Sequence, residues 1–440
     1  MKRTITVLIC ILILSLAVPA FTIGAFADST VGTSYSEAFS ERDLSGSYAD
    51  EVFHITLSGE TASSDSDRVS SAGGTVTVSG PGTYLISGTL ENGSIVVNAD
   101  KQDKVQLVLN GVTIHSDSFA SIYVVQADKV FVTLADGTSS TLENGGRFTQ
   151  TDDNKVDAVI YAKDDLTING SGSLIISSPA GHGIVGKDDV TVTGGSYTVT
   201  ASDSAITAKG SLNIAGGSFV ITTGEDGLHA ENDDDNTQGS IYIAGGSFTI
   251  KAGDDAVHAT TLLQIDGGSL DITAAEGMEA TYIRINDGRI ALTATDDGVN
   301  AAHKSTIYTP TIEINGGELT VTMGPGDTDG IDSNGNIIIT GGTVNVTAAS
   351  AFDYDGTASF TGGTVIINGQ QVEGLPNQMM GGRGGMMGGR GSMMGGHGEM
   401  IGEPGDMMQS NMMQGGPGNM NGDQGGMMQG GFGMRERKGW

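Results

Sequence analysis

The sequence predicts an all-β fold, a parallel β-helix in which short strands wind into a solenoid. Apolar residues alternate with polar ones, as in Thr75-Val76-Thr77-Val78, and this period of two is typical of strands. Glycine is abundant, with Gly 70 among 440 residues, but the G-X-Y period of collagen is missing. A Gly-Gly pair recurs at roughly 20 to 29 residues, the length of one coil of about three short strands.

The Gly-Gly repeat predicts where each coil turns. Glycine suits these corners because a tight turn needs a positive φ. A β-sandwich array would repeat near about 100 residues and a propeller at about 40 to 50, so both are disfavoured. The pairs begin at Gly194, Gly216, Gly245, Gly267, Gly316, Gly341 and Gly362, and Asp287-Gly288 fills the gap in the series.

Residues 1–27 have the pattern of a secretory signal peptide. Lys2 and Arg3 precede an apolar run, Ile5–Ala20, and Ala25-Phe26-Ala27 matches a cleavage site. We therefore expect a secreted protein, extracellular or bound at the cell surface. Cleavage removes Cys10, the only cysteine, which excludes disulfides and thiolate metal sites. No later apolar run is long enough to span a bilayer, so no transmembrane segment is expected after cleavage.

The rest of the chain divides by composition into three parts. Residues 28–70 are rich in Ser, Asp and Glu, and we expect a linker or N-terminal cap with one short strand. Residues 71–374 carry the strands and the repeat, and are the predicted β-helix domain. Residues 375–440 hold most of the 18 methionines among glycines, and we expect this tail to be disordered.

The chain is strongly acidic, with a formal net charge of −31. A phosphate backbone or an anionic membrane would be repelled by such a surface, so nucleic acid is excluded as a partner. The charge favours cations, or ligands that cations bridge.

A second repeat precedes the Gly-Gly strands and begins with Glu225-Asp226-Gly227-Leu228-His229-Ala230. By the alternation of a strand, Leu228 and Ala230 point inward, whereas Gly227 and His229 point outward. Equivalent positions of adjacent coils stack about 4.8 Å apart. The sequence therefore predicts an acidic row and an outer row. The acidic row comprises Asp226, Asp255, Glu276, Asp297 and Asp329; the outer row comprises His229, His258, Glu279, Asn300 and Asp332.

Stacked carboxylates repel one another, so they either gain protons or bind cations. Hard oxygen donors without thiolates favour Ca²⁺, the predicted cofactor. Each Asp-Gly alone reads as a simple turn, but five in register favour cation binding. The predicted metal-binding residues are Asp203, Glu225, Asp226, Asp233, Asp234, Asp235, Asp254, Asp255, Glu276, Asp296, Asp297, Asp327 and Asp329.

Two insertions, 232–237 and 302–310, leave the coil just after this motif, and we expect them on the same side. The first is an oxygen-donor cluster or a solvated acidic loop. The second adds basic and aromatic side chains. The predicted carbohydrate-binding residues are His229, His258, Glu279, Arg284, Asn300, Asp332, His303, Lys304 and Tyr308.

Three stretches carry a resemblance to a known family: residues 75–98, 105–114 and 127–135. With the repeated Asp-Gly-hydrophobic-His/Asn-Ala motif, the chain resembles the secreted clostridial family of carbohydrate-binding β-helix proteins, over roughly residues 50 to 370. The resemblance implies a right-handed β-helix, bound calcium, and binding of acidic polysaccharide or cellulose without established catalysis.

Three functions stay open at this point. The first is calcium-dependent, non-catalytic binding of an acidic plant cell-wall polysaccharide such as polygalacturonate. The second is a calcium-dependent pectate lyase-like enzyme, which needs a cationic base near the metal. The third is a structural cell-surface adhesin attached through its tail. No catalytic residue is predicted, because Gly181-His182-Gly183 and Asp188-Asp189 stand in the wrong order for a polygalacturonase.

Overall fold

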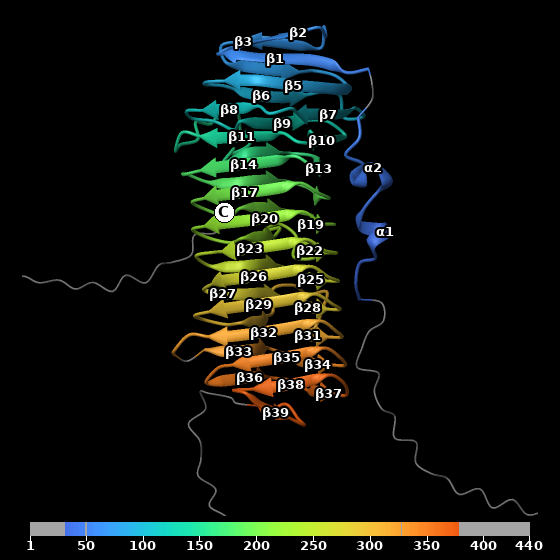
Figure 1. Cartoon of the computed structure of the whole chain (residues 1–440), viewed down its shortest axis with the longest axis vertical. Helices are drawn as coiled ribbons and strands as arrows, with labels where there is room; N and C mark the ends of the chain where they lie inside the picture. The colour runs from blue at the N-terminus through green and yellow to red at the C-terminus, as the bar shows by residue number, and fades with distance from the viewer. Residues whose placement is uncertain (1–30, 49–50, 327, 378–440) are drawn as a thin grey trace, which may run out of the picture. The chain divides into compact units, whose positions relative to one another are not determined.

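The computed structural model describes residues 31–48, 51–326 and 328–377. The chain divides into two units, 1–380 and 381–440, and the second lies outside the described residues, as do the predicted signal peptide and nearly all of the predicted tail. The first unit is a long stack of strands (Figure 1) with two helices of 4 residues, α1 (Tyr35–Ala38) and α2 (Glu41–Leu44). The predicted all-β class is confirmed.

Strand pairing is almost entirely parallel. From β7 (Lys104–Leu109) to β35 (Thr343–Thr347), each strand pairs with the strand three places later in the chain. The pairings form a 26-stranded and a 13-stranded sheet. The larger sheet contains two separate ladders that meet only at β5, because β5 pairs with both β7 and β8. Three ladders of parallel strands therefore run along the unit.

Ladder 1 contains β1 (Phe53–Gly59), β5 (Gly82–Leu90), β7 (Lys104–Leu109), β10 (Lys129–Leu134), β13 (Asp165–Gly170), β16 (Val190–Val192), β19 (Ser211–Ile214), β22 (Ser240–Ile243), β25 (Leu262–Ile265), β28 (Tyr282–Ile285), β31 (Thr311–Ile314), β34 (Asn336–Ile339) and β37 (Ala358–Phe360).

Ladder 2 contains β8 (Thr113–Ser116), β11 (Ser139–Asn144), β14 (Ser173–Ser178), β17 (Ser196–Ala201), β20 (Ser218–Thr223), β23 (Ser247–Lys251), β26 (Ser269–Ala274), β29 (Arg289–Ala294), β32 (Glu318–Met323), β35 (Thr343–Thr347) and β38 (Thr364–Ile367).

Ladder 3 contains β4 (Thr75–Val78), β6 (Ser94–Asn98), β9 (Ile122–Gln126), β12 (Ala158–Ala162), β15 (His182–Gly186), β18 (Ile206–Ala208), β21 (Leu228–Ala230), β24 (Asp255–Ala259), β27 (Glu276–Ala280), β30 (Val299–Ala301), β33 (Asp329–Ser333) and β36 (Ser350–Tyr354). Three strands pair antiparallel at the ends of the stack: β2 (Thr61–Ser64), β3 (Val69–Ala72) and β39 (Gln370–Val372).

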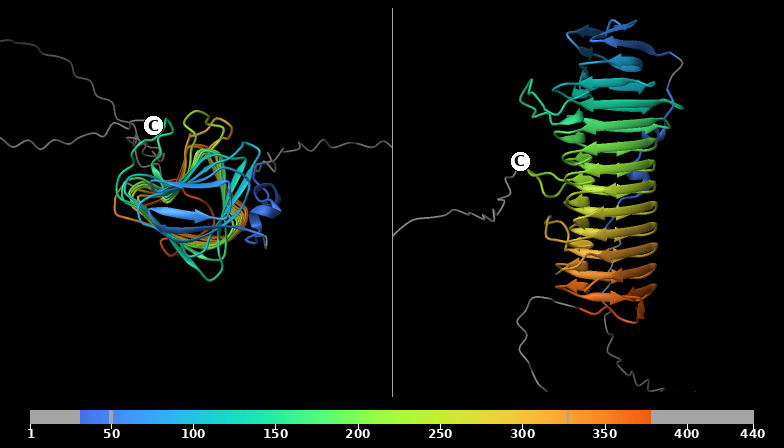
Figure 2. Two further views of the ribbon diagram at one scale, coloured as in Figure 1. Left: turned by 90° about the horizontal axis from the view of Figure 1, so that it is seen from above. Right: turned by 60° about the vertical axis from the view of Figure 1, so that its left-hand side comes forward.

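The core lies inside the coils that the three ladders form together (Figure 2). Inward side chains stack on their equivalents in the next coil, since the register is the same along each ladder. Tyr197, Phe219 and Phe248 show this in ladder 2, with ring centroids 4.7 Å and 4.6 Å apart and nearly parallel planes. Continuous apolar stacking of this kind, at about 25 cal/mol per Å² of buried apolar surface, holds the coils together.

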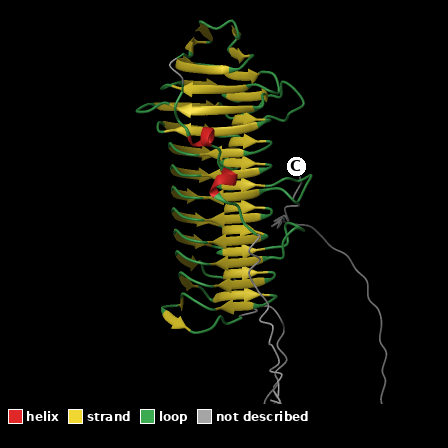
Figure 3. Ribbon diagram, turned by 90° about the vertical axis from the view of Figure 1, so that its right-hand side faces the viewer, coloured by secondary structure: helices red, strands yellow, loops and turns green. Residues whose placement is uncertain are grey.

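The N-terminal segment, residues 31–48, packs along the outer side of ladder 1 (Figure 3). The Asp43 carboxylate accepts a hydrogen bond from Thr167 Oγ1 at 2.6 Å and lies 2.8 Å from Lys129 Nζ. Further along, Gln264 exchanges two hydrogen bonds with the Thr33 backbone. Residues 28–70 were expected to be a linker or cap with one strand, but they hold both helices and three strands, and parallel pairing already starts at β1.

The glycines serve two different purposes. In the Gly-Gly corners the second glycine has the expected positive φ, for example +121° at Gly217. Gly227, the motif glycine, is not among the glycines with positive φ. A Cβ on Gly227 would lie 2.6 Å from the Ala256 carbonyl oxygen and 2.7 Å from Ile250 Cγ2. Gly227 therefore faces the core, and the expectation that it points outward is wrong. Glycine is needed there because the next coil approaches too closely for a side chain.

This distinction predicts opposite outcomes for two Gly→Ala variants. Gly227→Ala should destabilise the fold by about 1–3 kcal/mol, because the added methyl group overpacks the contact with the next coil. Gly216→Ala is the control, since a Cβ there meets nothing within 4 Å and Gly216 is not among the glycines with positive φ. Thermal unfolding followed by circular dichroism compares the two variants. An equal loss of stability in both would contradict the explanation.

Candidate cation and carbohydrate site

Ladder 3 carries the predicted outer row in register. His229 pairs with His258, His258 with Glu279, Glu279 with Asn300, and Asn300 with Asp332. The row continues to Asp353, which is the partner of Asp332 in β36. Sequence reasoning missed Asp353 because its coil lacks the motif glycine, although Ala351-Phe352-Asp353 keeps the same apolar-acid spacing.

The acidic row lies at the first residue of these strands or just before it. Asp255 and Glu276 are register partners. The Asp226 carboxylate accepts a hydrogen bond of 3.0 Å from the Asp255 backbone N–H, and Asp297 accepts one of 3.2 Å from Asp329. These carboxylates therefore accept hydrogen bonds from the backbone of the neighbouring coil, whereas the aspartate of a simple turn bonds its own local backbone.

In the N-terminal half of the two rows, histidines neutralise the acids. His229 Nδ1 lies 2.5 Å from Asp226 Oδ2, and His229 Nε2 lies 3.3 Å from Glu231 Oε2. Burial alone would lower the pKa of His229, but the hydrogen bonds to these two carboxylates raise it to about 10. The charged His229 ring stacks on His258, with centroids 4.8 Å apart.

Glu279 connects this half to the second insertion. Its Oε2 lies 3.3 Å from His258 Nδ1 and 2.8 Å from Lys304 Nζ. His258 Nδ1 also lies 2.7 Å from Asp255 Oδ2. Asp255, His258 and Glu279 are buried, and one donor atom from each lies within 4.8 Å of the others. Loop 302–310 thus places the Lys304 ammonium against this buried group.

The C-terminal half has no such compensation. Among the described residues, no ion pair involves Glu276, Asp297 or Asp332. Burial and the neighbouring Asp255 and Glu279 raise the pKa of Glu276 to about 8. Burial and nearby aspartates raise the pKa of Asp332 to about 7, and burial raises that of Asp297 to about 6. These carboxylates are held where they either keep a proton or require a cation.

Asn300 adds an oxygen to this half. Its Nδ2 lies 3.5 Å from Glu276 Oε2 and 3.4 Å from Glu279 Oε1. Its Oδ1 is buried and has no hydrogen-bond partner among the described residues. An unsatisfied buried carbonyl beside raised-pKa carboxylates fits a hard cation, for which such oxygens are the preferred ligands.

Other predicted metal-binding residues belong to neighbouring coils and to the first insertion. Burial and the neighbouring Asp203, Asp226 and Asp254 raise the pKa of Glu225, so these acids lie close together. Asp254 and Asp296 are exposed. In the first insertion, Asp233 and Asp234 lie 3.9 Å and 3.6 Å from Lys209 Nζ, and Asp235 accepts a hydrogen bond from Thr237 Oγ1. Asp327 lies outside the described residues.

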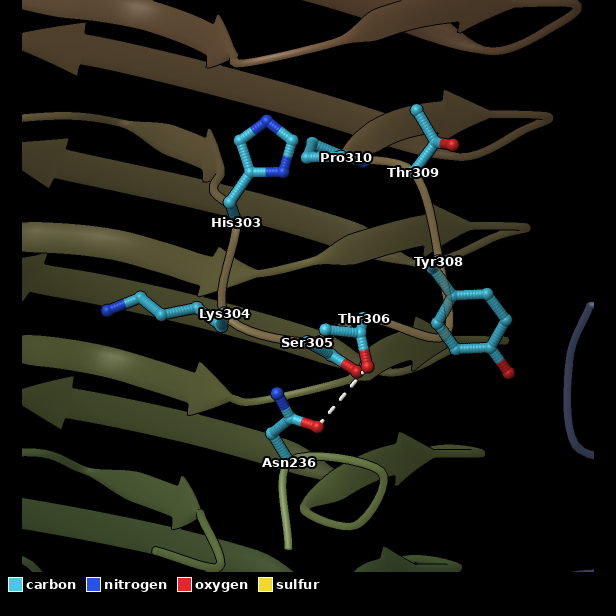
Figure 4. Close-up of a pocket in the computed structure, with 8 residues that line it drawn as sticks. All are labelled: Asn236, His303, Lys304, Ser305, Thr306, Tyr308, Thr309 and Pro310. Carbon is cyan, nitrogen blue, oxygen red and sulfur yellow. Dashed lines mark hydrogen bonds between the residues drawn. The ribbon is translucent and has the colours of Figure 1, made fainter.

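The two insertions meet, as expected for loops that leave the same side. Thr306 Oγ1 donates a hydrogen bond of 3.4 Å to Asn236 Oδ1, which is 70 positions away (Figure 4). A pocket of about 380 Å³ lies here. Its lining comprises Asn236, His303, Lys304, Ser305, Thr306, Tyr308, Thr309 and Pro310.

Two predicted carbohydrate residues are engaged elsewhere. Arg284 belongs to ladder 1, where its side chain is buried and its Nη2 lies 2.7 Å from Glu313 Oε2 under Val31. The Tyr308 ring packs edge-on against Tyr282 at 5.7 Å, on the side of the N-terminal segment. Neither side chain lies in the two rows of ladder 3. Residues that are close in sequence share a coil, but the next strand of that coil belongs to another ladder.

Comparison with known proteins places the chain in a family. The family model of carbohydrate-binding domain-containing proteins matches residues 72–327 and 276–374. The chain belongs to this family. It is also 40% identical, over 128 residues, to a carbohydrate-binding domain-containing protein of Acetivibrio thermocellus; the match covers 29% of this chain and 45% of that relative, less than half its length.

Among solved structures, the polysaccharide lyase-like protein from C. thermocellum, as a gadolinium derivative, is similar. The TM-score is 0.49 with 31% sequence identity, and the match covers 55% of this chain and 94% of that one. The predicted membership in a carbohydrate-binding family is confirmed by the family model. Within the described residues, both helices are too short to cross a membrane.

The raised pKa values predict how stability depends on pH when divalent cations are removed. Glu276 and Asp332 titrate at about 8 and 7 in the folded protein, against ordinary values of 4.5 and 3.8. The folded state therefore keeps protons that the unfolded chain releases, and stability should fall as pH rises from about 5 to 8. Thermal unfolding in EDTA across this range measures it.

The double variant Glu276→Gln/Asp332→Asn is the control for this prediction. Its stability should fall less steeply over the same range. Part of the slope above pH 6.5 remains, because the raised pKa of His229 acts in the same direction. Identical slopes in the wild type and the double variant would contradict the assignment.

Proposed function

We propose that this protein is a secreted, calcium-dependent and non-catalytic binding protein for acidic polysaccharide, such as polygalacturonate. The observation that carries the proposal is the uncompensated C-terminal half of the two rows, Glu276, Asp297 and Asp332. Family membership supports a carbohydrate as the ligand. The pattern of residues 1–27 supports secretion.

The fold that we infer is a right-handed parallel β-helix. From β7 to β35, each strand pairs in parallel with the strand three places later, and the resulting three ladders support a solenoid with three strands per coil. Parallel connections within a sheet are right-handed in about 98% of cases, which supports that hand. In this arrangement the rows are fixed on one outer edge, where a long polymer has access to several coils at once.

Calcium suits the donors of the C-terminal half. Glu276, Asp297, Asn300 and Asp332 supply only oxygen, and Ca²⁺ accepts about six to eight oxygens in flexible geometry. The residues fit the ion, since Asn300 Oδ1 is buried without a partner and the carboxylates lack basic partners. Sugar carboxylates and water would complete the ligand set.

A bridging cation also resolves a conflict of charge. A protein with net charge −31 repels a polyuronate chain. A divalent ion held by the rows changes the local sign and presents a ligand position to a uronate carboxylate. Beside the rows, the exposed side chains of His303 and Thr306 line the pocket and are placed to contact sugar hydroxyls. Cellulose, which has no carboxylate, would use only these neutral contacts.

Binding to polygalacturonate should therefore require calcium. We expect retention on immobilised polygalacturonate with CaCl₂ and its loss in EDTA, because the ion forms the bridge. Asp297→Asn/Asp332→Asn should weaken binding by at least about tenfold, equivalent to about 1.4 kcal/mol. Asp271→Asn, on the exposed face of β26, is the matched control and should bind like the wild type. Undiminished binding in EDTA would remove the bridging model.

The lyase alternative receives no support from the arginines near the rows. Arg284 is committed to Glu313, and the Arg289 guanidinium lies 3.9 Å from Glu318 on the ladder 2 face. A lyase needs a base beside the metal to remove a proton next to the uronate carboxylate. We expect no rise in ultraviolet absorbance from unsaturated products with polygalacturonate and calcium at alkaline pH; a steady rise would establish the enzyme instead.

A further inference from the structure

The buried group at the centre of the rows includes a nitrogen ligand, whereas the C-terminal half of the rows offers only oxygen. It consists of Asp255 and His258 in β24 and Glu279 in β27. Residue exposure is 5% for Asp255 and 7% for both His258 and Glu279. Two carboxylates and one imidazole, all metal-ligating types, thus converge at one buried position on successive coils.

The donor atoms have nearly the spacing of a metal site. His258 Nδ1 lies 2.7 Å from Asp255 Oδ2 and 3.3 Å from Glu279 Oε2. In a tetrahedral zinc site with bonds of about 2.0–2.1 Å, neighbouring donors are about 3.3 Å apart. The His258–Glu279 separation already has this value, and the Asp255–His258 separation needs to open by about half an ångström.

His258 Nδ1 faces two carboxylate oxygens, more than one N–H can serve. A single Nδ1 is shared by two carboxylate oxygens, and one N–H can be directed well at only one of them. Its other nitrogen, Nε2, is buried and has no hydrogen-bond partner among the described residues. An ion at Nδ1 would coordinate both carboxylates at once, which a proton cannot do.

The charge balance also leaves room for a divalent ion. Asp255 and Glu279 bring two carboxylates to this group, against which Lys304 brings one ammonium. The positive charge of the His229 imidazolium is balanced by Asp226 and Glu231, which contact its two ring nitrogens. It therefore contributes little to neutralising the group around His258.

We propose that Asp255, His258 and Glu279 form a binding site for a borderline divalent cation of the Zn²⁺ class, and that the Lys304 ammonium competes with this ion for Glu279. Imidazole favours such ions over Ca²⁺, which prefers oxygen alone. Three protein ligands leave a fourth position for water, as in open zinc sites. The site is independent of the proposed calcium bridge, because it uses a nitrogen ligand and a different set of residues.

The test is calorimetric titration of the full chain with ZnCl₂. His258→Gln should weaken zinc binding by at least about tenfold, because it removes the nitrogen ligand. Lys304→Met should strengthen it by about tenfold, because the competing ammonium is gone. The matched control is His115→Gln: His115 also lies near two acids, Asp117 and Glu143, but they contact opposite ring nitrogens and cannot share one ion with it.

Two further measurements keep the outcome clear. Titration with Co²⁺ should give the absorption of a tetrahedral ion in the wild type and Lys304→Met, and lose it in His258→Gln. Titration with CaCl₂ should be unchanged in His258→Gln, which separates this site from the calcium bridge. Zinc binding that is equal in the wild type and His258→Gln, or no tighter in Lys304→Met, would overturn the proposal. Lys304→Met decides the matter even if His258→Gln fails to fold.

Discussion

In-register parallel hydrogen bonding between coils is the constraint on which the whole molecule depends. It fixes the spacing of successive coils and places each side chain beside its equivalent in the next coil, as at His229 and His258. For apolar residues this repetition is favourable, and the aromatic stack of Tyr197, Phe219 and Phe248 shows it. For charged residues the same repetition brings like charges together, so the repulsion between carboxylates in the two rows must be compensated.

The two rows compensate for repulsion in different ways along their length. In the coils of Asp226 and Asp255 a histidine three residues later takes up the charge within the coil. In the coils of Glu276, Asp297 and Asp329 the same position holds Glu279, Asn300 or Asp332, and the repulsion is left in raised pKa values. Stability is given up in this second half, and the proposed cation would recover it. Because a folded-state ligand stabilises by mass action, such binding would be coupled to folding in the second half.

The sequence predicted the rows because their register depends only on the coil repeat and the alternation of a strand. It did not predict the N-terminal segment, whose contacts are polar and distant: Asp43 and Thr167 are 124 positions apart. The direction of Gly227 was misjudged because a glycine carries no side chain whose polarity reveals its face. Arg284 was assigned to the site through its nearness to Glu276 in sequence, although the next strand of a coil belongs to another ladder.

Insertions contribute to the site because a stack of paired parallel strands tolerates extra residues only where the chain turns between strands. Loops 232–237 and 302–310 emerge after β21 and β30, two strands of the same ladder, and therefore meet although their sequences are far apart. Lys304 reaches Glu279 from such a loop. A lysine within the row would be fixed by the strand and its neighbours in register. An ammonium carried by a loop can leave Glu279 without disturbing any backbone pairing, so the charge it supplies is exchangeable for that of a mobile ion.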